Sequence, residues 1–156
     1  LGPLSHPGGV RRQLIGCTEH ALGDRMIEAF RATGSVHTWV VTGHDALDEI
    51  AVTGPSRVLE LRDGEVREFE IDPSAHGIHI ADPDALPGGD PEQNAAIAIA
   101  LFAGEERGPA RDIVLLNAGA ALVVAGVVDD LDDGIEAAAA SIDDGSTAAV
   151  LEALRT

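Results

Sequence analysis

The chain has 156 residues, and its 10 basic residues against 27 acidic ones give a formal net charge of −17. This length accommodates one domain with a sizeable core, and a hydrophobic fraction of 45% excludes wholesale disorder. The excess of carboxylates argues against nucleic acid and anionic membranes as partners, because both are held through phosphate groups.

The first predicted elements are a loop and a helix. The density of Gly and Pro makes residues 1–9 a loop. A helix is expected from Thr18, because apolar residues recur at helical spacing as far as Phe30, and Gly34 ends it. Cys17, the single cysteine, lies at the apolar entry to this helix, where we expect a small core residue rather than a nucleophile.

A strand and a hairpin follow. Residues 36–42 are rich in β-branched and aromatic side chains, which predicts the best strand of the chain. A short helix is expected next, over residues 46–50. Residues 57–62 and 65–71 then flank Asp63-Gly64, a two-residue turn that predicts a β-hairpin.

The second half of the chain is predominantly helical. Residues 72–89 predict irregular structure, after which Asp90 and Pro91 are typical of an N-cap and a first helical residue. The helix that they open is apolar on nearly all sides as far as Ala103, which predicts a central, buried position.

Two further helical regions complete the chain. One opens at Gly108-Pro109 and extends to about Ala125, and the other covers roughly residues 132–155 with a break at Gly145. Helices around few strands predict an α/β fold, in which part of a central mixed sheet is flanked by helices and the hairpin is an excursion. Because so small a sheet is not a complete one, we expect an incomplete domain.

The segment that follows the Trp39 strand holds the densest set of possible metal ligands. His44, Asp45, Asp48 and Glu49 come in close succession after this strand, whose composition predicts that it is buried. In open α/β sheets, ligands collect at the carboxyl ends of the strands. Adjacent carboxylates suit Mg²⁺, which keeps several waters and bridges to phosphate. The spacing alone, however, favours solvated surface carboxylates, which are common in so acidic a chain.

Other motifs for chemistry are absent from the sequence. It contains neither a Gly-rich phosphate loop of standard spacing nor a Gly-x-Ser-x-Gly nucleophile elbow. Residues 129–134 resemble a calcium loop, but Leu131 stands where an oxygen ligand is needed. One cysteine allows no disulfide framework and no thiolate zinc site. Because no apolar run reaches the length of a bilayer span, we expect a soluble, cytoplasmic protein.

Short motifs in a fixed order run along nearly the whole chain. They are Leu1-Gly-Pro-Leu-Ser-His-Pro7, Gln13-Leu-Ile-Gly16, Gly43-His-Asp-Ala-Leu-Asp-Glu-Ile50, Gly88-Gly-Asp90 with Asn94-Ala95, Gly104-Glu105, Gly108-Pro-Ala-Arg-Asp112 and Leu116-Asn-Ala-Gly-Ala-Ala-Leu122. Each is short, but the ordered set is specific. It resembles the C-terminal half of anthranilate phosphoribosyltransferase, in the nucleoside phosphorylase and phosphoribosyltransferase superfamily.

The resemblance implies a reaction and a place in a larger protein. The family transfers ribosyl 5-phosphate from phosphoribosyl pyrophosphate to the amine of anthranilate, with Mg²⁺, in tryptophan biosynthesis. Residues 1–156 would be the C-terminal portion of the α/β phosphoribosyltransferase catalytic domain, without the N-terminal helical domain and the first part of the α/β domain. The resemblance also implies that the full-length protein is a homodimer whose partners are these small-molecule substrates.

The resemblance also assigns roles to particular residues. Asp48 and Glu49 match the acidic pair that coordinates Mg²⁺ on the pyrophosphate, with Glu49 serving both ions where two are bound. Gly2 and Pro3 match the Gly-Pro loop beside the anthranilate channel, where a side chain would obstruct the substrate. No catalytic nucleophile is implied, because positioning and charge stabilisation supply the rate.

The sequence departs from the family pattern at three positions. Thr42 stands where His is usual, Ala46 where Gly is usual and His6 where Asn is usual. A left-handed backbone at Ala46 would be one that Gly adopts more freely. The change at His6 affects the loop near the aromatic substrate, so a paralogue with a different acceptor is one interpretation.

Two other functions are compatible with these residues. One is a non-catalytic binding module that keeps the fold, and the other is a nucleoside phosphorylase-like enzyme that uses phosphate as acceptor. The 156 residues contain no counterpart of the family's glycine-rich pyrophosphate loop, its metal-binding Ser or the Arg that meets the anthranilate carboxylate. We therefore expect these residues alone to be inactive.

The charge predicts that stability rises with salt. All ten basic residues are Arg, and a surface with many carboxylates and few cations repels itself. Such a composition is typical of proteins from a salt-rich cytoplasm. A GC-rich genome, which also replaces Lys with Arg, is the alternative explanation. Since the Debye length falls to about 3 Å at 1 M salt, the melting temperature should be higher in molar salt than in dilute buffer. Equal melting temperatures by circular dichroism would contradict this expectation.

Overall fold

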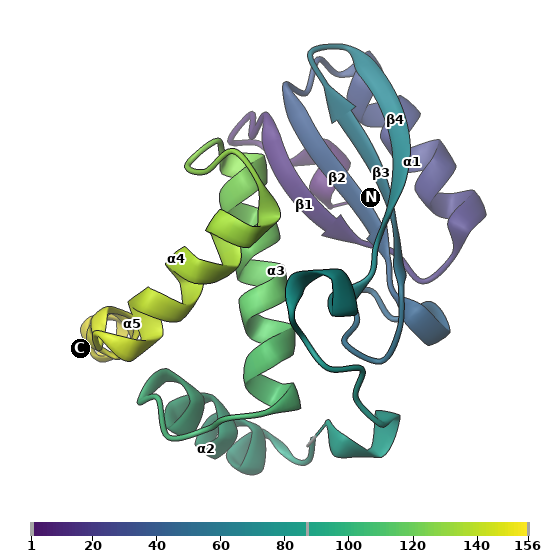
Figure 1. The fold of residues 1–156 in the computed structure, drawn as a ribbon. Coiled ribbons are helices and arrows are strands. Elements are labelled where there is room, and N and C mark those ends of the chain that lie inside the picture. The colour runs from purple at the N-terminus through teal and green to yellow at the C-terminus, as the bar shows by residue number, and fades with distance from the viewer. Residues whose placement is uncertain (1, 87, 156) are drawn as a thin grey trace.

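One mixed sheet organises the chain in the computed structural model, which describes residues 2–86 and 88–155 (Figure 1). Its strands lie in the order β1-β2-β3-β4, where β1 runs parallel to β2 and the later neighbours are antiparallel. The strands are β1 (Arg12–Gly16), β2 (His37–Thr42), β3 (Ser56–Arg62) and β4 (Glu65–Ile71). The predicted α/β class with a mixed sheet and a hairpin is therefore confirmed.

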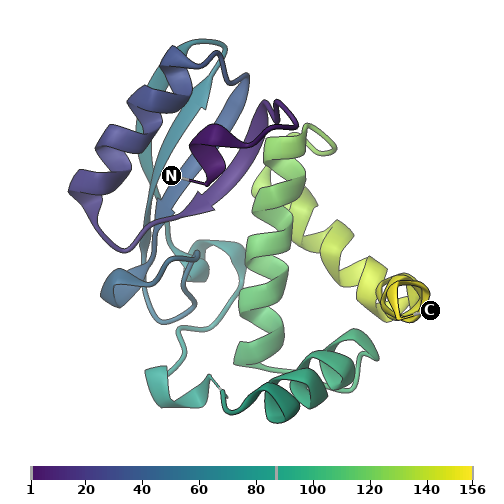
Figure 2. The ribbon, with the colours of Figure 1, turned by 180° about the vertical axis from the view of Figure 1, so that it is seen from behind.

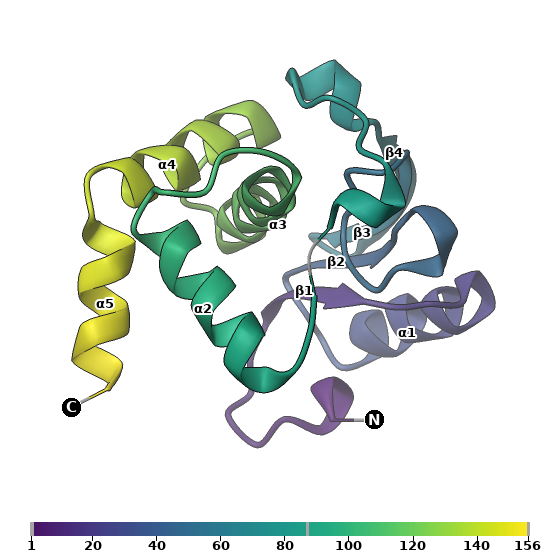
Figure 3. The same ribbon diagram turned by 90° about the horizontal axis from the view of Figure 1, so that it is seen from below.

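Helices cover both faces of this sheet. The α-helices are α1 (His20–Ala32), α2 (Pro91–Phe102), α3 (Pro109–Ala125), α4 (Leu131–Asp143) and α5 (Ser146–Leu154). The described residues also form the short 3₁₀-helices η1 (Pro3–Ser5), η2 (His44–Ala46), η3 (Pro73–His76) and η4 (Pro83–Ala85). Figures 2 and 3 show α1 on one face and α3 on the other, with α4 and α5 beyond α3. None of the described helices has the length and apolarity of a bilayer span.

Strand β2 is the centre of the packing. All six of its residues are buried, as expected for a strand with helices on both sides. Trp39 and Val41 pack into the core shared with α3, whereas Val40 packs with Phe30 of α1 on the opposite face. The predicted strand and the predicted first helix are thus confirmed, and together they divide the core into two layers.

The hairpin and the later helices also follow the sequence prediction. Asp63 and Gly64 both have positive φ, at 53° and 87°, which is the backbone that a tight two-residue hairpin turn requires. Asp90 caps α2 in a capping box with Gln93. Gly145, with φ of 82°, separates α4 from α5, as the predicted break requires.

Strand β1 is an element that the sequence does not predict. It has only five residues, in which Leu14 and Ile15 are the apolar members between Arg12 and Gly16. So short a segment carries no alternating pattern, and its pairing with β2 depends on residues distant in the chain. The opening loop can be compared only from Gly2, since Leu1 lies outside the described residues, as do Pro87 and Thr156.

The expectation that the helix opened by Asp90 is central was wrong. This helix, α2, lies away from the sheet, near α3 and α5 (Figure 3). Leu101 is its buried residue and packs with Leu115 and Ile142, whereas Ile99 is 46% exposed. Alanine is its commonest residue, and alanine methyl groups cost little when they face water. Its apolar composition therefore did not require burial on all sides.

A buried carboxylate ties β2 to the hairpin. Glu60 of β3 is 1% exposed and accepts hydrogen bonds at 2.9 Å from Trp39 Nε1, at 2.7 Å from His37 Nε2 and also from Arg67. Burial opposes ionisation, but the donors of Trp39, Arg67 and His37 outweigh it and hold the pKa of Glu60 below its usual range. Ionised Glu60 therefore stabilises the folded state.

Replacing Glu60 with glutamine should destabilise the protein in a pH-dependent way. A lowered folded pKa means that ionised Glu60 stabilises the fold above the ordinary glutamate pKa of about 4.3, and that this contribution is lost as the pH falls through the folded pKa. We expect Glu60→Gln to lower the free energy of unfolding by about 2 kcal/mol at neutral pH. The decrease should be smaller in acid, where Glu60 of the unsubstituted protein is itself protonated. Urea unfolding at both pH values measures this, with exposed Glu70→Gln as control; an equal loss at both would contradict it.

Candidate functional site

The segment of residues 43–50 lies where two parallel strands end. β1 ends at Gly16 and β2 at Thr42, and the two strands are paired in parallel up to Gly16 and Val41. The segment therefore lies at the carboxyl edge of the sheet, where the sequence analysis placed it (Figure 1).

The expected helix over residues 46–50 was wrong. The helical turn covers only His44–Ala46, and within it Asp45 and Ala46 have positive φ values of 54° and 59°. Leu47 is extended, so Asp48 and Glu49 lie in irregular backbone. A left-handed backbone costs an alanine about 1–2 kcal/mol. The family usually has glycine at the position of Ala46, and glycine adopts this conformation freely.

Two glycines allow this irregular backbone to approach the strand ends. A Cβ at Gly16 would overlap the carbonyl oxygen of Asp48, and a Cβ at Gly43 would overlap that of Glu49. The Gly43 amide also donates to Leu47 O at 2.8 Å, which closes the turn. The segment thus packs closely against the ends of β1 and β2 in an irregular conformation.

The backbone just after the acidic pair is fixed by side chains from elsewhere. Ile50 and Ala51 are fully buried. Asn117 of α3 accepts from the Ile50 amide at 2.9 Å and donates to the Ile50 carbonyl at 2.8 Å, and Ser56 Oγ accepts from the Ala51 amide at 2.9 Å. Asn117 was not among the predicted site residues; a lone asparagine in an apolar helix was the available signal, and it marks the residue but not the partner that the residue binds.

Asp48 and Glu49 themselves face solvent. Both are exposed, and neither carboxylate has a hydrogen bond or an ion pair with any other residue in the described part of the chain. Their oxygens are therefore not committed to the fold. Asp48 and Glu49 form an exposed pair on a backbone that is buried immediately afterwards.

The four candidate ligands of this segment do not form one cluster. His44 Nε2 lies 3.6 Å from Asp45 Oδ2, and both side chains are exposed. Across residues 2–86 and 88–155, no group of three or more His, Cys, Asp or Glu side chains is arranged to hold a metal ion. The donor set of Asp48 and Glu49 fits Mg²⁺, which is usually bound through one or two carboxylates, waters and substrate phosphates.

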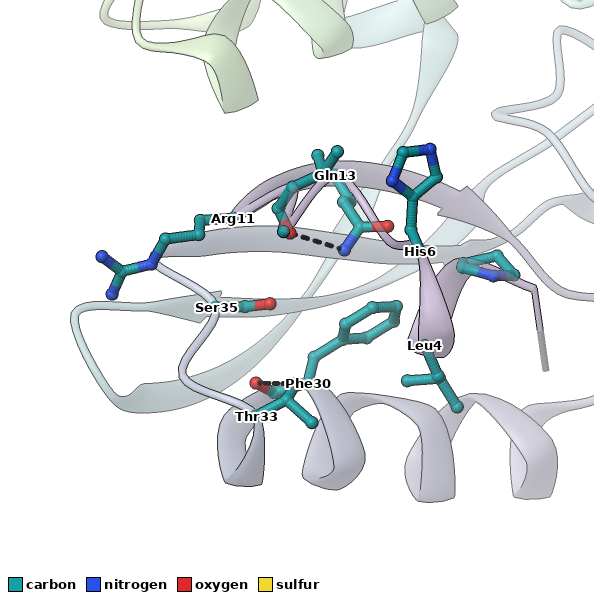
Figure 4. Close-up of a pocket in the computed structure, with 10 residues that line it drawn as sticks. Leu4, His6, Arg11, Gln13, Phe30, Thr33 and Ser35 are labelled. Atoms are coloured by element: carbon teal, nitrogen blue, oxygen red, sulfur yellow. Dashed lines mark hydrogen bonds between the residues drawn. The ribbon is translucent and has the colours of Figure 1, made fainter.

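The predicted Gly-Pro loop borders a cavity whose lining does not include Asp48 or Glu49. Pro3 lies in η1 and lines a cavity of about 340 Å³ between η1, β1 and α1, together with His6 and Phe30 (Figure 4). Arg11 and Ser35, which precede β1 and β2, also line it. This cavity thus lies toward the amino ends of the strands. A substrate role for Gly2, which is exposed, and for Pro3 stays a prediction.

Known proteins are similar to nearly the whole chain. Residues 1–148 match the glycosyl transferase family, a/b domain. The anthranilate phosphoribosyltransferase of Rhodopseudomonas palustris (strain HaA2) is 47% identical over 154 residues, which are 99% of this chain and 45% of that protein. That of Paramagnetospirillum magneticum is 49% identical over 151 residues, 97% of this chain and 43% of that protein. The chain thus spans less than half the length of these relatives.

Solved structures of anthranilate phosphoribosyltransferases share this fold over the part of their length that the chain covers. The anthranilate phosphoribosyltransferase of Thermus thermophilus superposes with a TM-score of 0.86 at 35% identity, over 97% of this chain and 44% of that one. The Saccharomyces cerevisiae enzyme in complex with PRPP and Mg gives a TM-score of 0.87 at 26% identity, again over 97% and 44%. The expected resemblance is confirmed, and the chain belongs to the glycosyl transferase family, a/b domain.

Proposed function

We propose that this chain supplies the metal- and pyrophosphate-binding part of an anthranilate phosphoribosyltransferase. The reaction would transfer ribosyl 5-phosphate from phosphoribosyl pyrophosphate to the amine of anthranilate. The observation that carries the proposal is the pair Asp48 and Glu49, exposed and free of partners among the described residues, at the carboxyl ends of two parallel strands. The relatives named above, one of which is solved in complex with PRPP and Mg, support it.

The chain's own residues would bind and orient the leaving group. Asp48 and Glu49 would hold Mg²⁺ through carboxylate oxygens, with Glu49 serving two ions where two are bound. Bound Mg²⁺ would stabilise the negative charge that develops on departing pyrophosphate. No nucleophilic side chain is required, because the amine of the acceptor attacks the anomeric carbon, and orientation supplies much of the rate. Cys17, which is buried, has no part in this scheme.

Further parts of the proposal concern partners. Anthranilate would enter beside the loop of Gly2 and Pro3, and the full-length protein would be a homodimer in the cytoplasm. The residues at Thr42 and His6, which differ from the family pattern, make the acceptor the part of the proposal that most needs direct measurement. Activity assays should therefore include both anthranilate and a nucleoside with phosphate.

Removing both carboxylates should weaken metal-dependent substrate binding. In the full-length protein, we expect Asp48→Asn/Glu49→Gln to weaken binding of phosphoribosyl pyrophosphate with Mg²⁺ by at least about tenfold, because the ion loses its protein ligands. Transfer to anthranilate, followed by product fluorescence, should fall by about 100-fold or more. Calorimetry measures the first effect, and unfolding curves check that both proteins are folded.

The matched control changes the same charge elsewhere. Glu105→Gln/Glu106→Gln removes an adjacent acidic pair in the loop between α2 and α3, and it should leave binding and transfer unchanged. Binding and transfer that survive loss of Asp48 and Glu49 would refute the proposal. A lack of saturable binding in the unsubstituted protein would favour a non-catalytic binding module, and turnover of a nucleoside but not of anthranilate would favour a nucleoside phosphorylase-like enzyme.

A further inference from the structure

The side chain of Asn117 makes a two-point contact with the backbone next to the acidic pair. Its Oδ1 accepts from the Ile50 amide at 2.9 Å, and its Nδ2 donates to the Ile50 carbonyl at 2.8 Å. Nδ2 also donates to Ile113 O at 2.9 Å, one turn earlier in α3. The two residues are 67 positions apart in the chain, so this contact joins α3 directly to the residue that follows Glu49.

The arrangement of donors and acceptors fixes the orientation of this amide. Rotating the carboxamide by half a turn would place its NH₂ group against the Ile50 amide and its oxygen against two carbonyl oxygens, so that all three hydrogen bonds would be lost. Asn117 is half-buried beside Leu116, which is fully buried, and burying amide groups without partners is costly. The contact therefore has one geometry.

Other contacts confine the acidic segment from the remaining sides. Gly16 and Gly43 leave room for the carbonyl groups of Asp48 and Glu49 at the ends of β1 and β2. Ser56 holds the next amide, that of Ala51. Of these contacts, only that of Asn117 binds both polar groups of a single peptide residue adjacent to the pair. It is thus the contact that sets how the backbone leaves Glu49.

We propose that Asn117 is a positioning residue for the acidic pair. It fixes the backbone at Ile50 and so determines where the carboxylates of Asp48 and Glu49 can meet a divalent cation and its phosphate ligands. This inference rests on the proposed function, because it assumes that the pair binds metal. Two adjacent carboxylates repel each other and face solvent, so without a fixed backbone they would spread over many arrangements, few of which bind the ion.

Two substitutions of Asn117 separate its contributions. Asn117→Leu has a similar size but makes none of the three hydrogen bonds. Asn117→Asp still accepts from the Ile50 amide but places an oxygen against the carbonyl groups to which Nδ2 donates. The matched control is Asn94→Leu, because Asn94 makes the same two-point contact with Gly89, at 3.0 Å for each bond, far from the acidic pair in sequence. All variants are made in the full-length protein.

Two readouts are measured below the melting transition of every variant. The first is hydrogen–deuterium exchange of the segment 43–52, with strand β3 as an internal control for global folding. The second is the affinity for Mn²⁺, measured by electron paramagnetic resonance as a spectroscopic substitute for Mg²⁺. We expect both Asn117 variants to exchange faster in this segment only and to bind Mn²⁺ about tenfold more weakly, as for other residues that support metal ligands. Asn94→Leu should change neither.

The outcomes distinguish this inference from the proposed function. Unchanged Mn²⁺ affinity in both Asn117 variants would overturn the positioning role, whether or not the segment exchanges faster. If Asn117→Leu fails to fold, the Mn²⁺ affinity of Asn117→Asp alone tests the positioning role. Mn²⁺ affinity that survives Asp48→Asn/Glu49→Gln would instead overturn the proposed function.

Discussion

Burial of β2 on both faces is the constraint from which the rest of the structure follows. A strand whose residues are all buried needs hydrogen-bonded neighbours on each edge and packed side chains above and below. β1 and β3 supply the edges, and α1 and α3 supply the two faces. Because α3 must pack against this strand, Asn117 is brought to the strand's carboxyl end. The geometry of the acidic segment is thus a consequence of how the core is packed.

The success of sequence-based prediction followed how local each signal was. The hairpin at Asp63-Gly64 and the start of α2 at Asp90 depend on neighbouring residues, and both were predicted correctly. Strand β1 was missed because its pairing is with a distant strand and its five residues have no period. The burial of α2 was predicted wrongly. A helix that is apolar on all sides can be buried, but its composition does not show whether other elements pack around it.

The same distinction holds at the candidate site. The spacing of Asp48 and Glu49 after a strand made them candidates, but on its own it favoured solvated surface carboxylates; the resemblance, which rests on ordered motifs along the chain, is what favoured a metal site. The helix expected around them was wrong: Gly16 at the end of β1 and Gly43 just after β2 let the backbone of this segment approach the strand ends, and Asp45 and Ala46 take left-handed conformations that a regular helix does not contain. The bond from Asn117 joins residues 67 positions apart, and no local pattern predicts such a contact. Position in the fold, not composition, distinguishes this acidic pair from the others.

The chain has 27 acidic residues, and the environments of their side chains show how Asp48 and Glu49 differ from others. Glu60 is buried, and its carboxylate already accepts hydrogen bonds from three side chains, so it is not accessible to a ligand. Asp90 and Asp130 accept from backbone amides at the starts of α2 and α4. Asp48 and Glu49 combine solvent exposure with a backbone held next to them by hydrogen bonds. Free oxygens on a fixed support are what a phosphate-bound cation requires, because binding then costs little further ordering of the protein.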